Sequence, residues 1–445
     1  MLRLGDRIAQ CVLEAFKKLP AKAKPRSYGG GLTEWVPLAG IVLLQRGTAA
    51  AKPDAAGEAN QDELTCVSLG YVYNAALIPS ARVLTTSNRT GMRCLPASKV
   101  PLAQGRCLHD WHAEIVALRA FNYYLLQECH SLASSTPSTS SYLCRRQAES
   151  ASTHASQPFA IRDDVKIYMY CSEAPCGDAS MELIMAAQDD ATPWEKPAAT
   201  ADGALTGRGF FSELGVVRRK PARGDAPETL SKSCTDKLAM RQCTSVLSSL
   251  TSLLIHPGNA YIDKLVLPAS QHVPAATARA FGPQGRMARL VDNDEVKRWE
   301  GGYAYKPFEV IETSGEFEYS RRSFSPGAKT TGSNITAMWT PQMQEVLIGG
   351  SRQGNKQFSV RGSSVISKSE MWKSAVKLSQ TLGLEELESS LTSDTYGAVK
   401  ASARLQGRKK VKEDVRRIAL QNWVRNDAGD GFSLNGHGTQ ASYTS

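Results

Sequence analysis

The chain has 445 residues and a net charge of +10, which results from 53 basic and 43 acidic side chains. Apolar residues make up 42% of it and charged residues 22%, a composition typical of globular proteins and not of disordered or fibrous ones. No apolar run approaches the roughly 18 residues that a membrane-spanning helix needs, which excludes a membrane-spanning protein. The positive charge favours an anionic partner, and nucleic acid is the first candidate.

Ten cysteines are distributed along the chain, whose N-terminal segment lacks the apolar core of a secretory signal. Residues 1–20 instead have the spacing of an amphipathic helix, with Ile8, Val12 and Phe16 on one face. We therefore expect an intracellular protein, in the nucleus, the cytoplasm or both. In such a compartment the cysteines are free thiols or metal ligands.

Patterns typical of strands and of helices alternate along the chain, which indicates an α/β fold. The chain shows no internal repeat. Strands are expected at residues 40–45, 64–73, 165–170 and 261–267, and helices at 112–126, 178–187, 369–382 and about 394–424.

Three stretches, near residues 47–61, 131–157 and 192–203, are rich in Ala, Ser, Thr or Pro. Such compositions bury too little apolar area to offset the entropy lost on ordering, so we expect loop insertions there. Residues 427–445 are rich in Gly, Ser and Asn and are expected to form a flexible tail. These boundaries predict a single domain over residues 1–426.

Two short motifs carry residues suited to zinc chemistry. His112 and Glu114 are separated by one residue at the start of a predicted helix. Cys176 lies in Pro-Cys-Gly-Asp, between a predicted strand and the helix that follows it. His and Cys are ligands that zinc prefers, and a carboxylate can take the proton of a zinc-activated water. A lone histidine is more often an ordinary helix residue. Together, however, the motifs match the H-x-E…P-C arrangement of zinc-dependent nucleobase deaminases.

The third ligand is not evident from the spacing. The deaminase signature usually closes with a cysteine three residues after the first, where this chain has Ala179. Cys171 lies on the incoming strand and points poorly for a shared ion. Cys234 and Cys243 follow on one predicted helix, and each could be a ligand or a buried thiol.

Three segments resemble the editase-type adenosine deaminases: HDWHAEI, APCGD, and RRKPARGD with SKSCTDKLA. This family comprises the double-stranded-RNA adenosine deaminases (ADARs) and the tRNA-specific adenosine deaminase that acts on alanine tRNA. The resemblance runs in pieces from about Arg93 to Trp423. The core-like sequence begins by about Gly30, which leaves no room for a preceding duplex-binding domain, so the tRNA branch is the nearer one. The run CTDKLAMRQCTSVLSSL is similar to the fungal form of that branch.

The resemblance implies a three-layer, cytidine-deaminase-like core, with a mixed sheet flanked by helices and a helical C-terminal part. It implies zinc bound by His112, Cys176 and Cys234, with Thr235 as a conservative departure beside the third ligand. Glu114 would take the proton of the zinc-held water and pass it to N1 and to the leaving ammonia, converting adenosine to inosine. The implied substrate is the adenosine immediately 3′ of the anticodon in alanine tRNA.

Two other functions fit parts of the pattern. An ADAR-type deaminase acting on double-stranded RNA would use the same catalytic residues. A non-catalytic RNA-binding protein with structural zinc would not need Glu114, since a structural site requires no carboxylate there. A metal-free, cysteine-rich binding module is the remaining alternative.

The C-terminal region concentrates the positive charge, with nine basic and two acidic residues between positions 400 and 425. On one continuous helix, Tyr396, Lys400 and Lys410 fall on the same side. The apolar residues Val411, Val415, Ile418 and Ala419 form an adjoining stripe, and lysines buried beside such a stripe need anions.

The family resemblance implies that these residues enclose a buried, structural inositol hexakisphosphate. Lys237, three residues after Cys234, could couple it to the metal site. The chain departs from the family's pattern at Leu118, Met240, Arg241 and Gln406, which predicts weaker binding or a less phosphorylated inositol. The ligands implied are Arg93, Asp110, Arg119, Lys237, Lys368, Tyr396, Lys400, Lys410 and Trp423.

The RNA contact is expected at Arg218, Arg219, Lys220 and Arg223, a basic stretch between the two cysteine motifs. A solvated basic loop without function is the alternative for this stretch. We expect tRNA as partner, with no membrane and no obligate protein partner.

Overall fold

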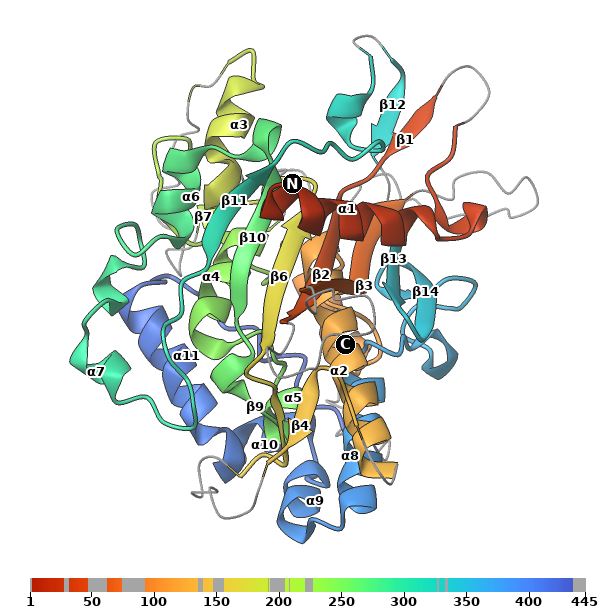
Figure 1. Cartoon of the computed structure of the whole chain (residues 1–445), viewed down its shortest axis with the longest axis vertical. Coiled ribbons are helices and arrows are strands. Elements are labelled where there is room, and N and C mark those ends of the chain that lie inside the picture. Colours follow the sequence, from red (N-terminus) through yellow and green to blue (C-terminus); the bar gives the residue numbers. More distant parts are fainter. Residues whose placement is uncertain are drawn as a thin grey trace, which may run out of the picture.

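The computed structural model describes residues 2–27, 32–46, 62–73, 93–134, 139–146, 156–190, 192, 205–207, 209–220, 227–325, 328–332 and 335–434. In this part of the chain, a mixed sheet of eight strands lies between helices (Figure 1). Its order is β11-β10-β6-β2-β3-β13-β14-β15. The strands are β2 (Leu38–Gln45), β3 (Glu63–Tyr73), β6 (Val165–Cys171), β10 (Ile262–Pro268), β11 (Glu309–Thr313), β13 (Ile335–Thr340), β14 (Met343–Ile348) and β15 (Ser351–Arg352).

Helices cover both faces of this sheet. Helix α1 (Leu4–Lys17) packs its apolar side, including Ile8 and Val12, on β2, β3 and β6. Helix α2 (Ala113–Ser134) lies on the opposite face, over β2, β3 and β13. A Cβ atom at Gly70 would lie 2.3 Å from the carbonyl oxygen of Ala113, so a glycine there lets α2 rest directly on β3. The three layers confirm the α/β class.

The strand register shows which strand ends lie together at one end of the sheet. Ala39 of β2 pairs with both Cys171 of β6 and Gly70 of β3. Ile335 of β13 pairs with both Tyr73 of β3 and Ile348 of β14. The C-terminal ends of β6, β3 and β14 therefore lie at the same end of the sheet, and α2 begins there. In α/β folds, ligands bind beyond the carboxyl ends of the strands.

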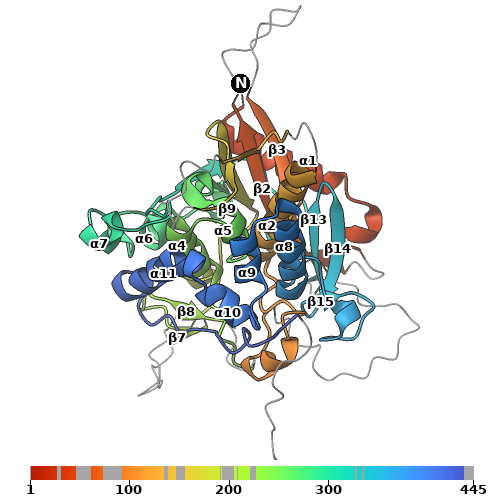
Figure 2. The ribbon, with the colours of Figure 1, turned by 90° about the horizontal axis from the view of Figure 1, so that it is seen from below.

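Short helices and small sheets surround this core. Figure 2 shows α8 (Lys368–Leu382), α9 (Glu385–Leu391), α10 (Tyr396–Ala401) and α11 (Gln406–Ile418) as a helical C-terminal part near α2 and α4 (Cys234–Thr244). The other helices are α3 (Met181–Ala186), α5 (Thr251–Leu254), α6 (Pro274–Phe281) and α7 (Asp294–Lys297). The small sheets pair β1 (Thr33–Trp35) with β12 (Thr330–Gly332), β4 (Leu143–Arg145) and β9 (Ile255–His256) with β5 (Phe159–Ile161), and β7 (Leu205–Thr206) with β8 (Arg218–Arg219).

The helix expected over 394–424 is wrong, because the structure divides it. Ser402 has extended dihedral angles (φ −56°, ψ 151°), and a 3₁₀ turn (Ala403–Leu405) separates α10 from α11. The helical phase is therefore not continuous from Tyr396 to Lys410. This break changes which side chains of α11 face the interior.

The expected loop insertions fall largely outside the described residues. Residues 47–61 lie outside them entirely, as does most of 192–203. Within 131–157, α2 continues to Ser134 and residues 143–145 form β4, so that stretch is only partly loop. The tail was expected to begin at 427, but the chain still packs beyond it: Asp430 and Phe432 are buried, and the ring of Phe432 stacks on Tyr396.

Among the described residues, no helix is long and apolar enough to cross a bilayer.

Candidate active site

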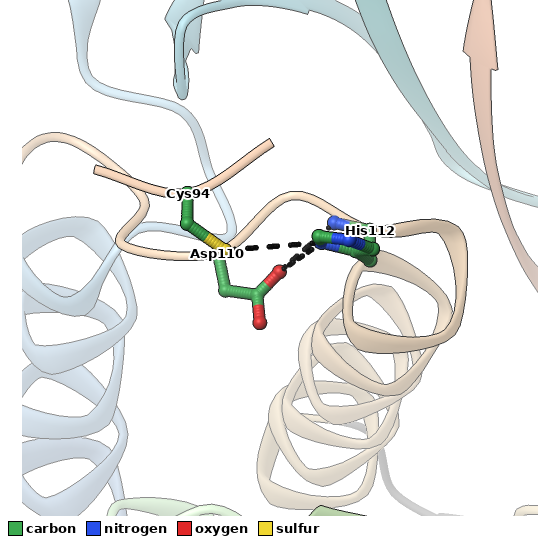
Figure 3. A group of neighbouring side chains, drawn as sticks. All are labelled: Cys94, Asp110 and His112. Atoms are coloured by element: carbon green, nitrogen blue, oxygen red, sulfur yellow. Dashed lines mark hydrogen bonds and ion pairs between the residues drawn. The ribbon is translucent and has the colours of Figure 1, made fainter. Parts of the chain in front are cut away.

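His112 lies just before α2, at the end of the sheet where β3 and β6 finish, and its ring is hydrogen-bonded to Asp110 (Figure 3). Nδ1 of His112 is 2.7 Å from Oδ1 of Asp110, which also accepts a hydrogen bond from the backbone N–H of His112. A carboxylate on one ring nitrogen fixes the tautomer and leaves the other nitrogen free to bind a metal. Nε2 of His112 therefore has the character of a zinc ligand.

Cys94 lies in the same group, although the sequence analysis did not single it out. Its Sγ is 3.9 Å from Nδ1 of His112, and the ligand atoms of Cys94, Asp110 and His112 lie within 4.8 Å of one another. Cys94 pairs with Asp110 in an isolated antiparallel bridge. No local motif marks this cysteine, because a long-range backbone pairing brings it to the site.

Cys176 and Cys234 meet where the loop after β6 contacts the start of α4. Sγ of Cys176 accepts a hydrogen bond from the backbone N–H of Cys234, at 3.4 Å. The hydroxyl of Thr235 donates to the carbonyl oxygen of Pro175, at 2.9 Å. Gly177 has φ 114°, and a Cβ there would lie 2.4 Å from Oγ of Ser233. Only glycine fits this contact, which holds the two cysteines together.

Glu114 and the two cysteines form one electrostatic unit. Burial, reinforced by the charge of Cys176, raises the pKa of Glu114. The hydrogen bond with Cys234, together with the charges of Lys220 and His112, holds the pKa of Cys176 well below its ordinary value, while burial raises the pKa of Cys234. These interactions link Cys176 with Cys234, His112 and Glu114. One nitrogen and two sulfur donors suit zinc.

Two lysines, Lys220 and Lys237, donate hydrogen bonds to Asp110, the residue that is hydrogen-bonded to His112. Nζ of Lys220 is 2.9 Å from Oδ2 of Asp110 and 3.3 Å from Sγ of Cys234. Lys237 also donates to Oδ2 of Asp110, and its Nζ is 2.7 Å from Oγ of Ser231. Asp110 thus accepts from two cations on one side and holds His112 on the other. Residues that hydrogen-bond to the partner of a metal ligand orient that ligand and affect the affinity for the metal.

Comparison with known proteins agrees with this geometry. Residues 87–427 match the family model of the adenosine-deaminase (editase) domain. The chain belongs to this family. Its members are zinc-dependent, and the protein is an adenosine deaminase.

Named relatives of this deaminase act on RNA. It is 32% identical to the tRNA-specific adenosine deaminase 1 of Schizosaccharomyces pombe, over 96% of each chain. It is 29% identical to the enzyme of that name from Saccharomyces cerevisiae, over 60% of this chain and 59% of the relative. The double-stranded RNA-specific editase Adar of Drosophila melanogaster is 26% identical over 43% of this chain and 28% of its own length.

The RNA contact expected at Arg218, Arg219 and Lys220 needs correction, because the deaminase buries all three side chains. Arg218 is 2% exposed and donates to the carbonyl oxygen of Phe210 at 2.9 Å. Lys220 contacts Asp110 and Cys234. Arg223 lies outside the described residues. A run of basic residues in a short segment does not reveal whether its side chains point inward or to solvent.

Next to the catalytic residues, the deaminase has two adjoining cavities of about 340 and 480 Å³. They share Met240, Arg408, Lys412, Trp423 and Asn426 in their walls. Most of the residues expected to bind inositol hexakisphosphate line one or both cavities: Asp110, Arg119, Lys237, Lys368, Tyr396, Lys400 and Trp423. Three of the departures, Leu118, Met240 and Arg241, also line them. Gln406 is exposed and donates to the carbonyl oxygen of Ala401.

Two residues expected in this set lie elsewhere. The side chain of Lys410 is 61% exposed and pairs with Asp414 at 2.7 Å. The guanidinium of Arg93 lies over the ring of Trp35, 5.8 Å from its centroid, and does not line the cavities. Lys410 was misplaced because the helix is broken at Ser402, which rotates α11 relative to α10.

The same break brings Lys412 into the cavity wall, together with Arg408. Burial, together with the nearby cations Arg408, Lys400 and Arg241, holds the pKa of Lys412 well below its ordinary value. Among the described residues, the two walls carry eleven basic side chains and four acidic ones. So many cations in the walls of two adjoining cavities indicate an anionic ligand.

Proposed function

We propose that this protein is a zinc-dependent deaminase that converts adenosine to inosine in tRNA, at the adenosine immediately 3′ of the anticodon in alanine tRNA. The proposal rests on a chain of contacts that joins His112 through Asp110 and Lys220 to Cys234, and Cys234 to Cys176, with Glu114 buried beside Cys176. The full-length similarity to a relative named as tRNA-specific supports the choice of tRNA.

His112, Cys176 and Cys234 would hold the zinc ion. Asp110 fixes the His112 ring and Lys220 contacts Cys234, so the ligands are oriented before metal binds. When bound, zinc would supply a Lewis acid that lowers the pKa of a water at an open position. Cys94 lies near Nδ1, the nitrogen that Asp110 holds. We therefore assign it to the support of His112.

Glu114 would move the protons of the reaction. Its side chain is buried beside Cys176, and burial raises its pKa, which helps the carboxyl group to hold a proton between the steps of the reaction. It would accept a proton from the attacking water and deliver it to N1 of adenine. The proton of the hydroxyl group newly bound to C6 would then pass through Glu114 to the amino group, which leaves as ammonia and leaves the C6 carbonyl of inosine. The adenine must be unstacked to reach this site, which costs least in a single-stranded loop such as an anticodon loop.

The test is a single-turnover assay on transcribed alanine tRNA, with the target adenosine changed to guanosine as control. Inosine at that one position, dependent on the adenosine, is the expected result. A preference for long duplex RNA would instead identify an ADAR-type editor. The similarity to the Drosophila editase is the reason for including duplex RNA in the test. No inosine in either RNA would refute the proposed activity.

We also propose that the two cavities enclose inositol hexakisphosphate as a structural cofactor. Eleven basic side chains in their walls could neutralise its phosphates. Lys237 lines the smaller cavity and binds Asp110, so a phosphate bound to Lys237 would be linked to His112 through Lys237 and Asp110. Mass spectrometry of the denatured protein should detect the inositol polyphosphate. Its absence from folded, active protein would refute this part.

A further inference from the structure

The RNA-binding surface has to lie away from the segment where the sequence placed it, because Arg218, Arg219 and Lys220 are buried. A different group of cations lies at the end of the sheet that carries the proposed active site. Segment 349–362, which includes β15, follows β14 at that end of the sheet, and residues 94–109 lead directly into the active site. We call the basic side chains of these two segments the basic rim: Lys99, Arg106, Arg352, Lys356 and Arg361.

The basic rim has no acidic residue within its own segments. None occurs between Glu345 and Glu370, or between Arg93 and Asp110. Lys99, Arg352, Lys356 and Arg361 are exposed, and Arg106 is partly exposed. Arg352 lies 3.3 Å from Glu345, whereas Lys356 and Arg361 form no ion pair with the residues that the structure describes. The rim therefore presents concentrated positive charge to solvent.

The two segments are fastened to each other next to His112. The backbone N–H of Leu108 donates to the carbonyl oxygen of Gly350 at 2.9 Å. Gly350 has φ 81°, and a Cβ there would lie 2.6 Å from the carbonyl oxygen of Leu108 and 3.0 Å from the ring of Trp111. Only glycine allows this approach. Segment 349–362 is thus anchored to the residues that immediately precede the proposed zinc ligand.

Segment 349–362 is also ordered internally. Nε2 of Gln357 donates to the carbonyl oxygen of Gly349 at 2.7 Å, and Ser359 caps a 3₁₀ turn (Val360–Gly362) by accepting from the N–H of Gly362 at 3.1 Å. Val360 is 61% exposed on this turn. The cations therefore sit on a pre-organised support, which reduces the entropy lost on binding.

The strand order places the segment that carries three of the rim residues near the start of α2. Helix α2 begins over β3, and β14 is two strands away, about 10 Å at the usual strand spacing. A nucleotide whose base reaches Glu114 would leave its neighbours within reach of this rim. Contacts to phosphates set the position of a nucleic acid, while contacts to bases set specificity.

We propose that the basic rim binds the sugar–phosphate backbone that flanks the target adenosine and positions the RNA for deamination. This inference rests on the proposed function, because it assumes that the deaminated adenosine lies within a polynucleotide. Lys356 and Arg361 are the residues to test, because both are exposed on the pre-organised segment 349–362 and form no ion pair with the described residues.

The test compares Lys356→Glu/Arg361→Glu with Lys297→Glu/Arg298→Glu, in the full chain. The control has the same change of charge on exposed residues in and beside α7, at the β11 side of the sheet. The Kd for alanine tRNA is measured by fluorescence anisotropy across a salt series. We expect the rim variant to weaken binding at least about tenfold and to make the slope of log K against log salt shallower by about 2.

In kinetics, the rim variant should raise KM while kcat at saturating tRNA stays within about threefold of wild type. An unchanged Kd and salt slope would overturn the inference, as would an equal loss in the control. A fall in kcat without a change in Kd would also overturn it. Because binding is measured directly, this result is separate from the proposed activity, which would fail only if the wild-type protein formed no inosine.

Discussion

Nζ of Lys220 lies 3.3 Å from Sγ of Cys234, which places a buried ammonium against a sulfur that we propose binds zinc. The same ammonium binds Asp110, which holds His112. One cation thus supports two of the three proposed ligands. A charge that favours the thiolate and fixes the carboxylate should raise metal affinity, and this relationship can be tested directly.

Lys220→Met should lower zinc affinity or inosine formation by about 10–100-fold, because both Cys234 and Asp110 lose a cation. Lys220→Arg keeps the charge but not the geometry and should recover only part of the loss. Zinc content and single-turnover rate are measured together. Lys264→Met, at a partly exposed lysine of β10 that pairs with Glu309, is the control. Full activity and zinc content in Lys220→Met would contradict the assigned role.

Glu114→Ala should retain zinc and the fold while inosine formation falls at least about 10³-fold, because the proton carrier is lost. Elemental analysis and circular dichroism check zinc and fold, and a single-turnover assay checks the chemistry. Turnover at the wild-type rate would remove Glu114 from the mechanism. Loss of zinc in this variant would instead give the carboxylate a role in metal binding.

Cys234→Ala should abolish stoichiometric zinc, whereas Cys243→Ala should retain it. Both cysteines lie on α4 and both are fully buried, so the pair separates ligation from packing. Cys243 packs in the core cluster, and its removal should cost about 1 kcal/mol of stability through lost packing alone. Elemental analysis of both variants decides the matter. Zinc retained by Cys234→Ala and lost by Cys243→Ala would move the third ligand.

Lys412→Ala should reduce the amount of co-purified inositol polyphosphate and lower Tm, because Lys412 lines both cavities. Lys410→Ala should change neither, since that side chain faces solvent. The two lysines are two positions apart on α11, so composition and helix propensity are matched. Mass spectrometry and thermal unfolding provide the readouts. Equal effects of the two substitutions would contradict the placement of the polyphosphate.

Local sequence patterns predicted much of the core. Residues 165–170 alternate as a buried strand does, and β6 spans Val165–Cys171. The helix after His112 follows its apolar spacing and forms α2. The H-x-E and Pro-Cys motifs were recognisable because each lies within a few residues of a predicted helix start. Periodicity and short motifs are local properties, so a single sequence carries them.

The sequence alone therefore determined the α/β class, the position of the catalytic motifs and the presence of excess positive charge. Only the tertiary structure decided where that charge points. The break at Ser402 put Lys412 in the cavity wall instead of Lys410, and long-range contacts turned Lys220 toward Asp110 and Cys234. The direction of a side chain depends on the phase of its element and on partners distant in sequence. Composition and spacing record neither.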